Sequence, residues 1–278
     1  MSGTLFLCAT PIGNLKDITE RVLETLKAVD LIAAEDTRNS LKLLNHFDIH
    51  VPLTSYHEHN RFEKAEELIS ALLSGQDVAL ITDAGTPVIS DPGEVLVNRC
   101  IEEGINITSL PGPCAVITAL TLSGINSARF SFEGFLPGDN RERKARLKEL
   151  KGETRTLVFY ESPHHLRKTL KDLLETLGDR KISLCRELTK IHEEVIRTTI
   201  GQAVSRYSDT DPKGEYVLVV EGKDPEEVKR EKAESFKGLS IKEQVEDYEE
   251  QGLSHKEAMK AVAEDRGISK REVYKELL

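Results

Sequence analysis

The chain has 278 residues, which is more than one ordinary α/β unit needs, so its length favours about two domains over a single bundle. With 38% apolar and 31% charged residues, its composition is typical of a globular protein and excludes an intrinsically disordered one. Forty-eight acidic against thirty-eight basic side chains give a net charge of −10, so a nucleic-acid partner would need a local basic patch.

The N-terminal segment predicts neither a membrane helix nor a secretion signal. No apolar run approaches the roughly eighteen residues that a membrane helix needs, and the apolar start ends at Thr10-Pro11 with no basic segment before it. We therefore expect a cytoplasmic protein. The four cysteines form no CxxC pair, which predicts reduced, packed thiols.

The first part of the chain alternates short β-type runs with helical patterns, which predicts an α/β fold with largely parallel sheets. Asp17 with Glu20 predicts a capping box at the start of the first helix. The pattern predicts an N-terminal α/β domain over residues 1–122, with strands at 4–9, 31–34, 78–82 and 105–110 and helices at 18–28, 40–47, 61–73 and 94–103.

A second α/β domain is expected over residues 123–222. It begins near Phe130 and has predicted strands at 156–160, 181–185 and 215–221 and a helix at 164–177. Residues 223–239 are rich in charge and predict a linker or a solvated helix. Three Ser-x-x-Glu pairs then predict a C-terminal unit of three short helices over 240–278, the pairs being Ser240/Glu243, Ser254/Glu257 and Ser269/Glu272.

Three loops rich in glycine and proline follow predicted strands, and they are the strongest candidates for a ligand site. They span residues 10–14, 83–93 and 110–113. Ligands of open α/β sheets bind beyond the carboxyl ends of strands, where such loops let backbone groups approach closely. The alternative is that glycine and proline only punctuate βα turns.

Several common motifs are absent. Neither a Rossmann GxGxxG, a P-loop nor a GxSxG nucleophile elbow occurs. His57 and His59 lack the spacing of a metal site, and a polar loop is the favoured interpretation there.

Several segments of the sequence resemble those of a known family. The segments Thr10-Pro11-Ile12-Gly13-Asn14-Leu15, Ala34-Glu35-Asp36-Thr37-Arg38 and 83–93 are similar to those of the small-subunit ribosomal RNA (cytidine-2′-O)-methyltransferase I family, within the tetrapyrrole-methylase fold. Further matches lie at 133–137, 160–164, 186–190 and 213–215, so the resemblance spans nearly the whole chain. The third loop reads Pro111-Gly112-Pro113-Cys114-Ala115 where the wider superfamily often has Pro-Gly-x-Ser.

The resemblance implies methyl transfer from S-adenosylmethionine, held between the two α/β domains, to a cytidine ribose in small-subunit ribosomal RNA near the decoding centre. It also implies a homodimer and requires no metal. A sulfonium ligand agrees with an acid-rich, backbone-lined pocket. The residues expected at the cofactor are Pro11, Ile12, Gly13, Asp83, Ala84, Gly85, Pro87, Ile89, Ser90, Pro113, Ala115, Tyr160, Glu161 and Gly214.

Catalytic candidates follow a predicted strand of the second domain. A ribose hydroxyl is a poor nucleophile until a positioned group accepts its proton or a cation stabilises its alkoxide. We expect Glu187 to orient the hydroxyl or accept its proton, and Arg186 and Lys190 to stabilise charge. Two alternatives stay open: these side chains only pair with one another, or proximity alone supplies the rate.

Basic residues of the segment 141–155 predict an exposed helix for RNA phosphates, with Arg143, Lys144, Arg146 and Lys148 as the expected contacts. A merely solvated helix is the alternative. The last two tail helices are spaced like a helix-turn-helix, with Lys270, Arg271 and Lys275 facing out, although a simple capping hairpin is equally compatible.

Two other functions compete with rRNA methylation. One is a methyltransferase of the same fold that acts on a tetrapyrrole or another small molecule, for which a basic helix has no obvious use. The other is a non-enzymatic RNA-binding or ribosome-assembly factor, against which the intact 83–93 loop argues.

Overall fold

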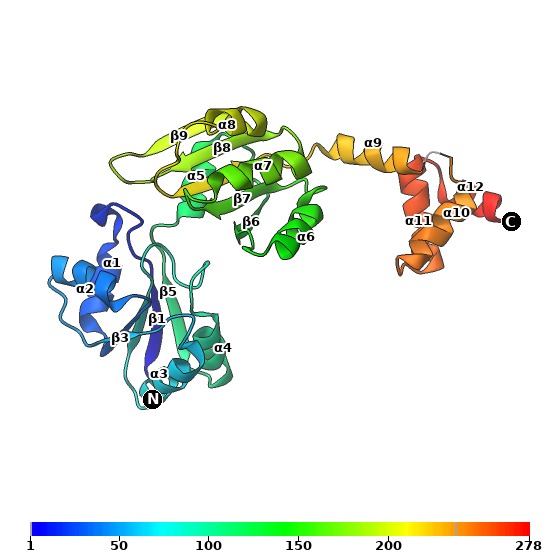
Figure 1. Ribbon diagram of the computed structural model, residues 1–278. Helices are drawn as coiled ribbons and strands as arrows, with labels where there is room; N and C mark the ends of the chain where they lie inside the picture. Colours follow the sequence, from blue (N-terminus) through cyan, green and yellow to red (C-terminus); the bar gives the residue numbers. More distant parts are fainter. Residues whose placement is uncertain (1, 237) are drawn as a thin grey trace.

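The computed structural model describes residues 2–236 and 238–278 and contains two five-stranded sheets followed by a helical tail (Figure 1). Lys237, within the predicted linker, lies outside the described residues. The predicted α/β class is confirmed. The predicted domain boundaries after residues 122, 222 and 239 stay predictions.

The first sheet is wholly parallel, with the strand order β3-β2-β4-β1-β5. Helices α1 and α2 pack on one face of it, and α3 and α4 pack on the other, so the central strand β4 is buried along its whole length, as in doubly covered parallel sheets. The elements are β1 (Thr4–Cys8), η1 (Leu15–Asp17), α1 (Glu20–Ala28), β2 (Leu31–Ala34), α2 (Thr37–His46), β3 (Leu53–Ser55), α3 (Arg61–Leu73), β4 (Val78–Ile81), α4 (Glu94–Glu102) and β5 (Asn106–Leu110).

The start of the first helix differs from the prediction. Thr19, not Asp17, is the N-cap of α1, and its hydroxyl accepts a hydrogen bond of 3.3 Å from the backbone N–H of Val22. Asp17 belongs to the short 3-10 turn that precedes the helix. Both side chains suit a cap, and the turn places the threonine at the position where the helix begins.

The second sheet has the order β6-β7-β10-β8-β9, and only the β6–β7 pair is parallel. The prediction of largely parallel pairing is therefore wrong here. Residues 187–193 connect β8 to β9 without a helix, and so short a connection allows only an antiparallel pair. The elements are α5 (Ala115–Ser123), β6 (Phe130–Phe135), α6 (Asn140–Leu150), β7 (Thr156–Glu161), α7 (Leu166–Leu177), β8 (Lys181–Arg186), β9 (Glu194–Thr199), α8 (Ile200–Arg206) and β10 (Tyr216–Val220).

The tail stands away from both sheets at the end of α9 (Pro225–Ser235), as Figure 1 shows. Its three short helices are confirmed as α10 (Ile241–Glu250), α11 (His255–Arg266) and α12 (Lys270–Leu277), each with its predicted capping box. They enclose a small core of their own around Val245, Val262 and Val273. Within the described residues, no helix is both long and apolar enough to cross a membrane.

Candidate active site

A pocket of about 310 Å³ lies where the strand-end loops of the two sheets meet. The first sheet and the segment that follows it contribute Ile12, Asp83, Ala84, Gly85, Thr86, Ile89, Ser90, Asp91, Cys114 and Ala115. The second sheet contributes Phe135, Tyr160, Glu161, Ser162, Cys185, Glu187, Leu188, Lys190, Glu215, Tyr216 and Val217. A ligand here would touch both halves of the chain.

Hydrogen bonds join the three predicted loops into one wall. Thr10 and Gly85 exchange two backbone bonds of 2.8 and 3.0 Å, and the buried hydroxyl of Thr10 donates to the carbonyl of Thr82 at 3.0 Å. The hydroxyl of Thr86 donates to the carbonyl of Pro113 at 3.2 Å. Gly85 has a φ of +88°, a conformation that a side chain would strain. The loops are thus fixed relative to one another before any ligand binds.

Backbone strain is concentrated in the loops that border the pocket. Val88 and Ser90 have φ values of 75° and 65°, and Glu187 and Thr189 have values of 50° and 66°. A left-handed conformation is rare for such residues and costs about 1–3 kcal/mol each. Strain of this kind persists where surrounding contacts enforce it, and it is typical of functional loops.

Carboxylates give one side of the pocket a negative potential. Asp83 accepts hydrogen bonds from the backbone N–H of Asp36 at 3.3 Å and from the amide of Asn39 at 3.0 Å. Burial and, to a smaller extent, the negative charges of Glu35 and Asp83 together raise the pKa of Asp91 to about 6. A cation bound here would stabilise the ionised form of Asp91. The acidic side of the pocket therefore favours a positively charged ligand.

Two aromatic side chains, Phe135 and Tyr160, form an apolar part of the pocket lining. The ring of Tyr160 lies 4.9 Å from that of Phe132 and 5.6 Å from that of Phe135, measured between centroids. Burial raises the pKa of Tyr160 to about 12, so the phenol stays neutral at physiological pH. Such a surface suits the flat face of an aromatic ligand group.

Glu187, Lys190 and Glu215 form a charged cluster at the edge of the pocket. The ammonium of Lys190 donates to Glu187 at 2.9 Å and to Glu215 at 2.8 Å, and the backbone N–H of Glu215 donates to Glu187 at 3.0 Å. Burial raises the pKa of Glu187, but these hydrogen bonds outweigh burial and the pKa falls below its usual value. Glu187 is thus an ionised carboxylate near neutral pH, held in a fixed orientation.

Gly214 shapes this cluster, because a Cβ at Gly214 would lie 2.4 Å from Cγ of Glu187. Arg186 does not line the pocket and instead pairs with Glu194 at 3.2 Å.

Comparison with known proteins identifies the family. The sequence pattern of the tetrapyrrole (corrin/porphyrin) methylases matches residues 4–204. The ribosomal RNA small subunit methyltransferase I of Halalkalibacterium halodurans is 50% identical over 98% of this chain and 93% of its own length, and that of Bacillus subtilis is 47% identical over 98% and 93%. The chain belongs to the ribosomal RNA small subunit methyltransferase I family, within the tetrapyrrole methylases.

Other comparisons bear on the fold and on the length of the family's members. A methyltransferase I from Thermotoga maritima is 48% identical and matches 80% of this chain along 100% of its own length. Among solved structures, a uroporphyrin-III-C-methyltransferase from Thermus thermophilus has a TM-score of 0.56 at 18% identity, covering 79% of this chain and 94% of its own. A diphthine synthase has a TM-score of 0.61 at 14% identity, covering 80% and 90%. At such identities the likeness shows a common fold only.

Of the residues predicted at the methyltransferase I site, eleven line the pocket: Ile12, Asp83, Ala84, Gly85, Ile89, Ser90, Ala115, Tyr160, Glu161, Glu187 and Lys190. Four others support it from behind or lie beside it: Pro113 accepts from Thr86, Gly13 and Gly214 pack on Lys190 and Glu187, and Pro11 is buried in the first loop. Pro87 also lies outside the lining. The binding and catalytic roles of all of them stay predictions.

Sequence reasoning missed ten lining residues: Thr86, Asp91, Cys114, Phe135, Ser162, Cys185, Leu188, Glu215, Tyr216 and Val217. Thr86, Asp91 and Ser162 belong to the family motifs, so the sequence could have predicted them as lining residues. Tyr216 and Val217 lie in the apolar strand β10 and carry no such signal.

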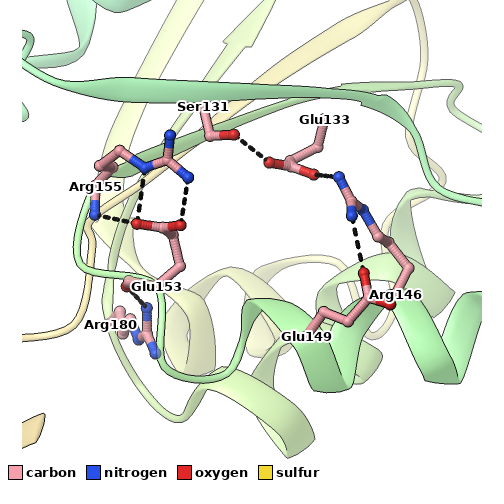
Figure 2. Close-up of polar contacts among 7 residues, drawn as sticks. All are labelled: Ser131, Glu133, Arg146, Glu149, Glu153, Arg155 and Arg180. Atoms are coloured by element: carbon pink, nitrogen blue, oxygen red, sulfur yellow. Dashed lines mark hydrogen bonds and ion pairs between the residues drawn. The ribbon is translucent and has the colours of Figure 1, made fainter. Parts of the chain in front are cut away.

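The predicted exposed basic helix needs a correction. Arg143 is only 5% exposed, because its guanidinium donates to Asp172 at 2.6 Å and to the hydroxyl of Thr169 at 2.7 Å. Figure 2 shows that Arg146 is also engaged, by Glu133 and Glu149. Lys144 and Lys148 are exposed, and neither has an ion pair within the described residues.

The pocket fits the cofactor that the family implies. The hydroxyl of Ser162 is buried and has no hydrogen-bond partner within the described part of the chain, although it belongs to the lining. Such an orphan group is costly unless a ligand or water satisfies it. A lining that combines acidic side chains with aromatic rings matches a ligand that is both cationic and aromatic, as S-adenosylmethionine is.

Proposed function

We propose that this chain methylates the 2′-hydroxyl of a cytidine ribose in small-subunit (16S) ribosomal RNA near the decoding centre, with S-adenosylmethionine as methyl donor. One observation supports it most: an acidic, partly aromatic pocket between two sheets, in a chain 50% identical to a named ribosomal RNA methyltransferase. A ribosomal substrate would place the protein in the cytoplasm.

Loops of both sheets would provide the cofactor contacts. When bound, S-adenosylmethionine supplies a methyl group made electrophilic by its positive sulfur. Asp83 and Asp91 would attract that charge, Gly85 would let the backbone approach closely, and Ser162 would donate its free hydroxyl proton or accept a hydrogen bond. Tyr160 and Phe135 would cover an aromatic face of the ligand.

The second sheet would prepare the nucleophile. Glu187 would accept the proton of the ribose hydroxyl at a carboxylate oxygen as the oxygen attacks. Lys190, 2.9 Å from that carboxylate, would stabilise the negative charge on the attacking oxygen and keep Glu187 ionised beforehand. The hydrogen bonds that Lys190 donates to Glu187 and Glu215 hold these side chains in place, so little reorganisation is needed.

The substrate would reach the pocket along exposed basic residues. Lys144 and Lys148 of α6 and the exposed Lys270, Arg271 and Lys275 of α12 would contact phosphates. We propose a homodimer as the working form, which analytical ultracentrifugation would establish.

Transfer of labelled methyl groups tests the function directly. Purified protein is incubated with labelled S-adenosylmethionine and either free 16S RNA or assembled small subunits from unmethylated cells, and the modified nucleotide is mapped. We expect label on the 2′-oxygen of a cytidine. A parallel reaction contains a tetrapyrrole in place of RNA, and label on that tetrapyrrole with none on RNA would support the small-molecule alternative. Failure to bind the cofactor would support a non-enzymatic RNA-binding factor.

A further inference from the structure

One buried arginine lies behind the pocket, on a helix that otherwise faces solvent with its basic residues. Arg143, Leu147 and Leu150 occupy the buried stripe of α6, so Arg143 stands where the helix pattern calls for an apolar residue. A buried guanidinium is costly unless it is paired and hydrogen-bonded. The hydrogen-bond partners of Arg143 therefore indicate which part of the structure the buried guanidinium stabilises.

The guanidinium of Arg143 donates hydrogen bonds to two different partners. Its Nε donates to Asp172 at 2.6 Å, and its Nη2 donates to Oγ1 of Thr169 at 2.7 Å. Both partners lie on α7, and Thr169 is wholly buried. The ion pair with Asp172 fixes the plane of the guanidinium and thus the direction in which Nη2 points.

The Thr169 hydroxyl links Arg143 to a residue of the pocket. Because arginine can only donate, the hydroxyl must accept from Arg143, and its single proton is then free for another acceptor. That acceptor is the carboxylate of Glu161, a pocket residue that is only 6% exposed. The other oxygen of Glu161 accepts the backbone N–H of Ser162 at 2.8 Å.

Helix α6 is itself held firmly, so Arg143 has a rigid base. Arg146, one turn further along, donates to Glu133 of β6 at 2.5 Å, and Ser131 donates to the same carboxylate at 2.5 Å (Figure 2). The Glu133 side chain is 1% exposed. The contacts run from a fixed helix to the end of β7, where the chain turns and presents Ser162 to the pocket.

We propose that Arg143 is a positioning residue for cofactor binding: through the Thr169 hydroxyl it orients the Glu161 carboxylate and so sets the turn that carries the unpartnered hydroxyl of Ser162. This inference rests on the proposed function. It gives the buried arginine of α6 a role distinct from the RNA contacts proposed for its exposed lysines.

The test measures the Kd of S-adenosylmethionine by calorimetry, together with the Tm of each ligand-free variant. Thr169→Val keeps the shape of the side chain and leaves the Arg143–Asp172 ion pair intact, but it removes the hydroxyl. We expect it to weaken affinity about fivefold or more, and Thr169→Ser to restore affinity to within about twofold of the parent.

Thr156→Val is the matched control. Thr156 is also buried, at the opposite end of β7, where its hydroxyl donates to the carbonyl of Asn126 at 2.5 Å. It should lower the Tm as Thr169→Val does and leave the Kd unchanged. If Thr169→Val binds like the parent, or if Thr156→Val weakens binding equally, the inference is overturned.

Arg143→Lys provides a second route if Thr169→Val does not fold. Lysine keeps the charge near Asp172 but lacks the planar fork that reaches both partners, so the same loss of affinity is expected. The variant that combines Arg143→Lys with Thr169→Val should bind S-adenosylmethionine no more weakly than Thr169→Val alone. Both changes interrupt the same series of hydrogen bonds from Arg143 to Glu161. Additive losses would show that Arg143 acts by another route.

The parent chain is titrated first. If it does not bind S-adenosylmethionine at millimolar concentration, the proposed function and this inference both fail. If the parent binds and the Thr169 and Arg143 variants bind equally well, only the inference fails.

Discussion

A Cβ placed on Gly13 would lie 2.4 Å from Cγ of Lys190. The loop after β1 therefore touches the loop after β8 with no room for a side chain between them. Since Lys190 also holds Glu187 and Glu215, a residue of the first sheet's loop fixes the charged cluster of the second.

The first prediction follows from this contact. Gly13→Ala should push the Lys190 side chain away from Glu187 and lower the single-turnover methylation rate about tenfold, because a displacement of about 1 Å at a catalytic group is costly. Gly104→Ala is the control: Gly104 also has a positive φ, but a Cβ there would meet nothing within 4 Å. Equal losses in both variants would attribute the effect to backbone strain alone.

Glu187 and Lys190 are expected to act on the chemical step. Glu187→Gln removes the proton acceptor and should lower the single-turnover rate about a hundredfold, and Lys190→Met should lower it about tenfold. Affinities for cofactor and RNA should stay close to those of the parent. Near-parental rates in both variants at saturating substrates would instead favour catalysis by positioning and leave these side chains as an ion pair.

The raised pKa of Asp91 predicts a pH-dependent stability. The folded pKa of about 6 exceeds the ordinary 3.8, so the folded state is favoured while Asp91 is protonated, and this contribution is lost as the pH rises through 6. Asp91→Asn should therefore stabilise the ligand-free protein by about 1 kcal/mol at pH 8, or roughly 2–4 °C in Tm, and have little effect at pH 4. Melting curves across this range provide the check, and a constant Tm difference would contradict the assignment.

Lys144 and Lys148 are expected to bind RNA phosphates. Replacing both with alanine should weaken RNA binding and reduce the slope of log affinity against log salt by about one unit per lysine. A variant with Lys27→Ala and Lys229→Ala removes the same charge from α1 and α9 and should leave the slope unchanged. Equal slopes for the α6 variant and the parent would exclude α6 as an RNA contact.

A chain that ends at Phe236 should keep its cofactor site. The tail packs around its own small core, and a Thermotoga maritima relative matches only 80% of this chain along its whole length. We expect unchanged Tm and cofactor affinity for the truncated chain and weaker methylation of small subunits. Lost cofactor binding would show that the tail completes the site, and full methylation would remove its docking role.

Local signals in the sequence predict much of this fold. The three Ser-x-x-Glu pairs correctly mark three helix starts, since a capping box needs only two residues three positions apart. The strand before Asp83 is equally plain, because a strand buried on both faces reads as a continuous apolar run. The short strand β3 and helix α5 were missed: β3 has three residues, and α5 is apolar nearly all round and lacks helical periodicity.

In the candidate site, too, residues with a local sequence signal were predicted and those without one were missed. The loops rich in glycine and proline could be predicted from the sequence, because these residues determine the backbone conformation locally. Residues such as Tyr216 reach the pocket only through the antiparallel pairing of β10 with β7 and β8, which no local pattern specifies. The burial of Arg143 was missed because its partners Thr169 and Asp172 lie on another helix.

The position of β1 within its sheet has a consequence for synthesis on the ribosome. β1 lies between β4 and β5, with Leu5 opposite Val78 and Thr4 opposite Asn106. At typical elongation rates β1, which precedes both neighbours in the chain, therefore waits roughly 5–20 s for the second of them. Both edges of this apolar strand are unpaired until β4 emerges, and one edge stays unpaired until β5 follows, so the strand can pair with other chains during that time. The order of the strands along the chain thus leaves β1 open to pairing with other chains for longer than the strands that follow it.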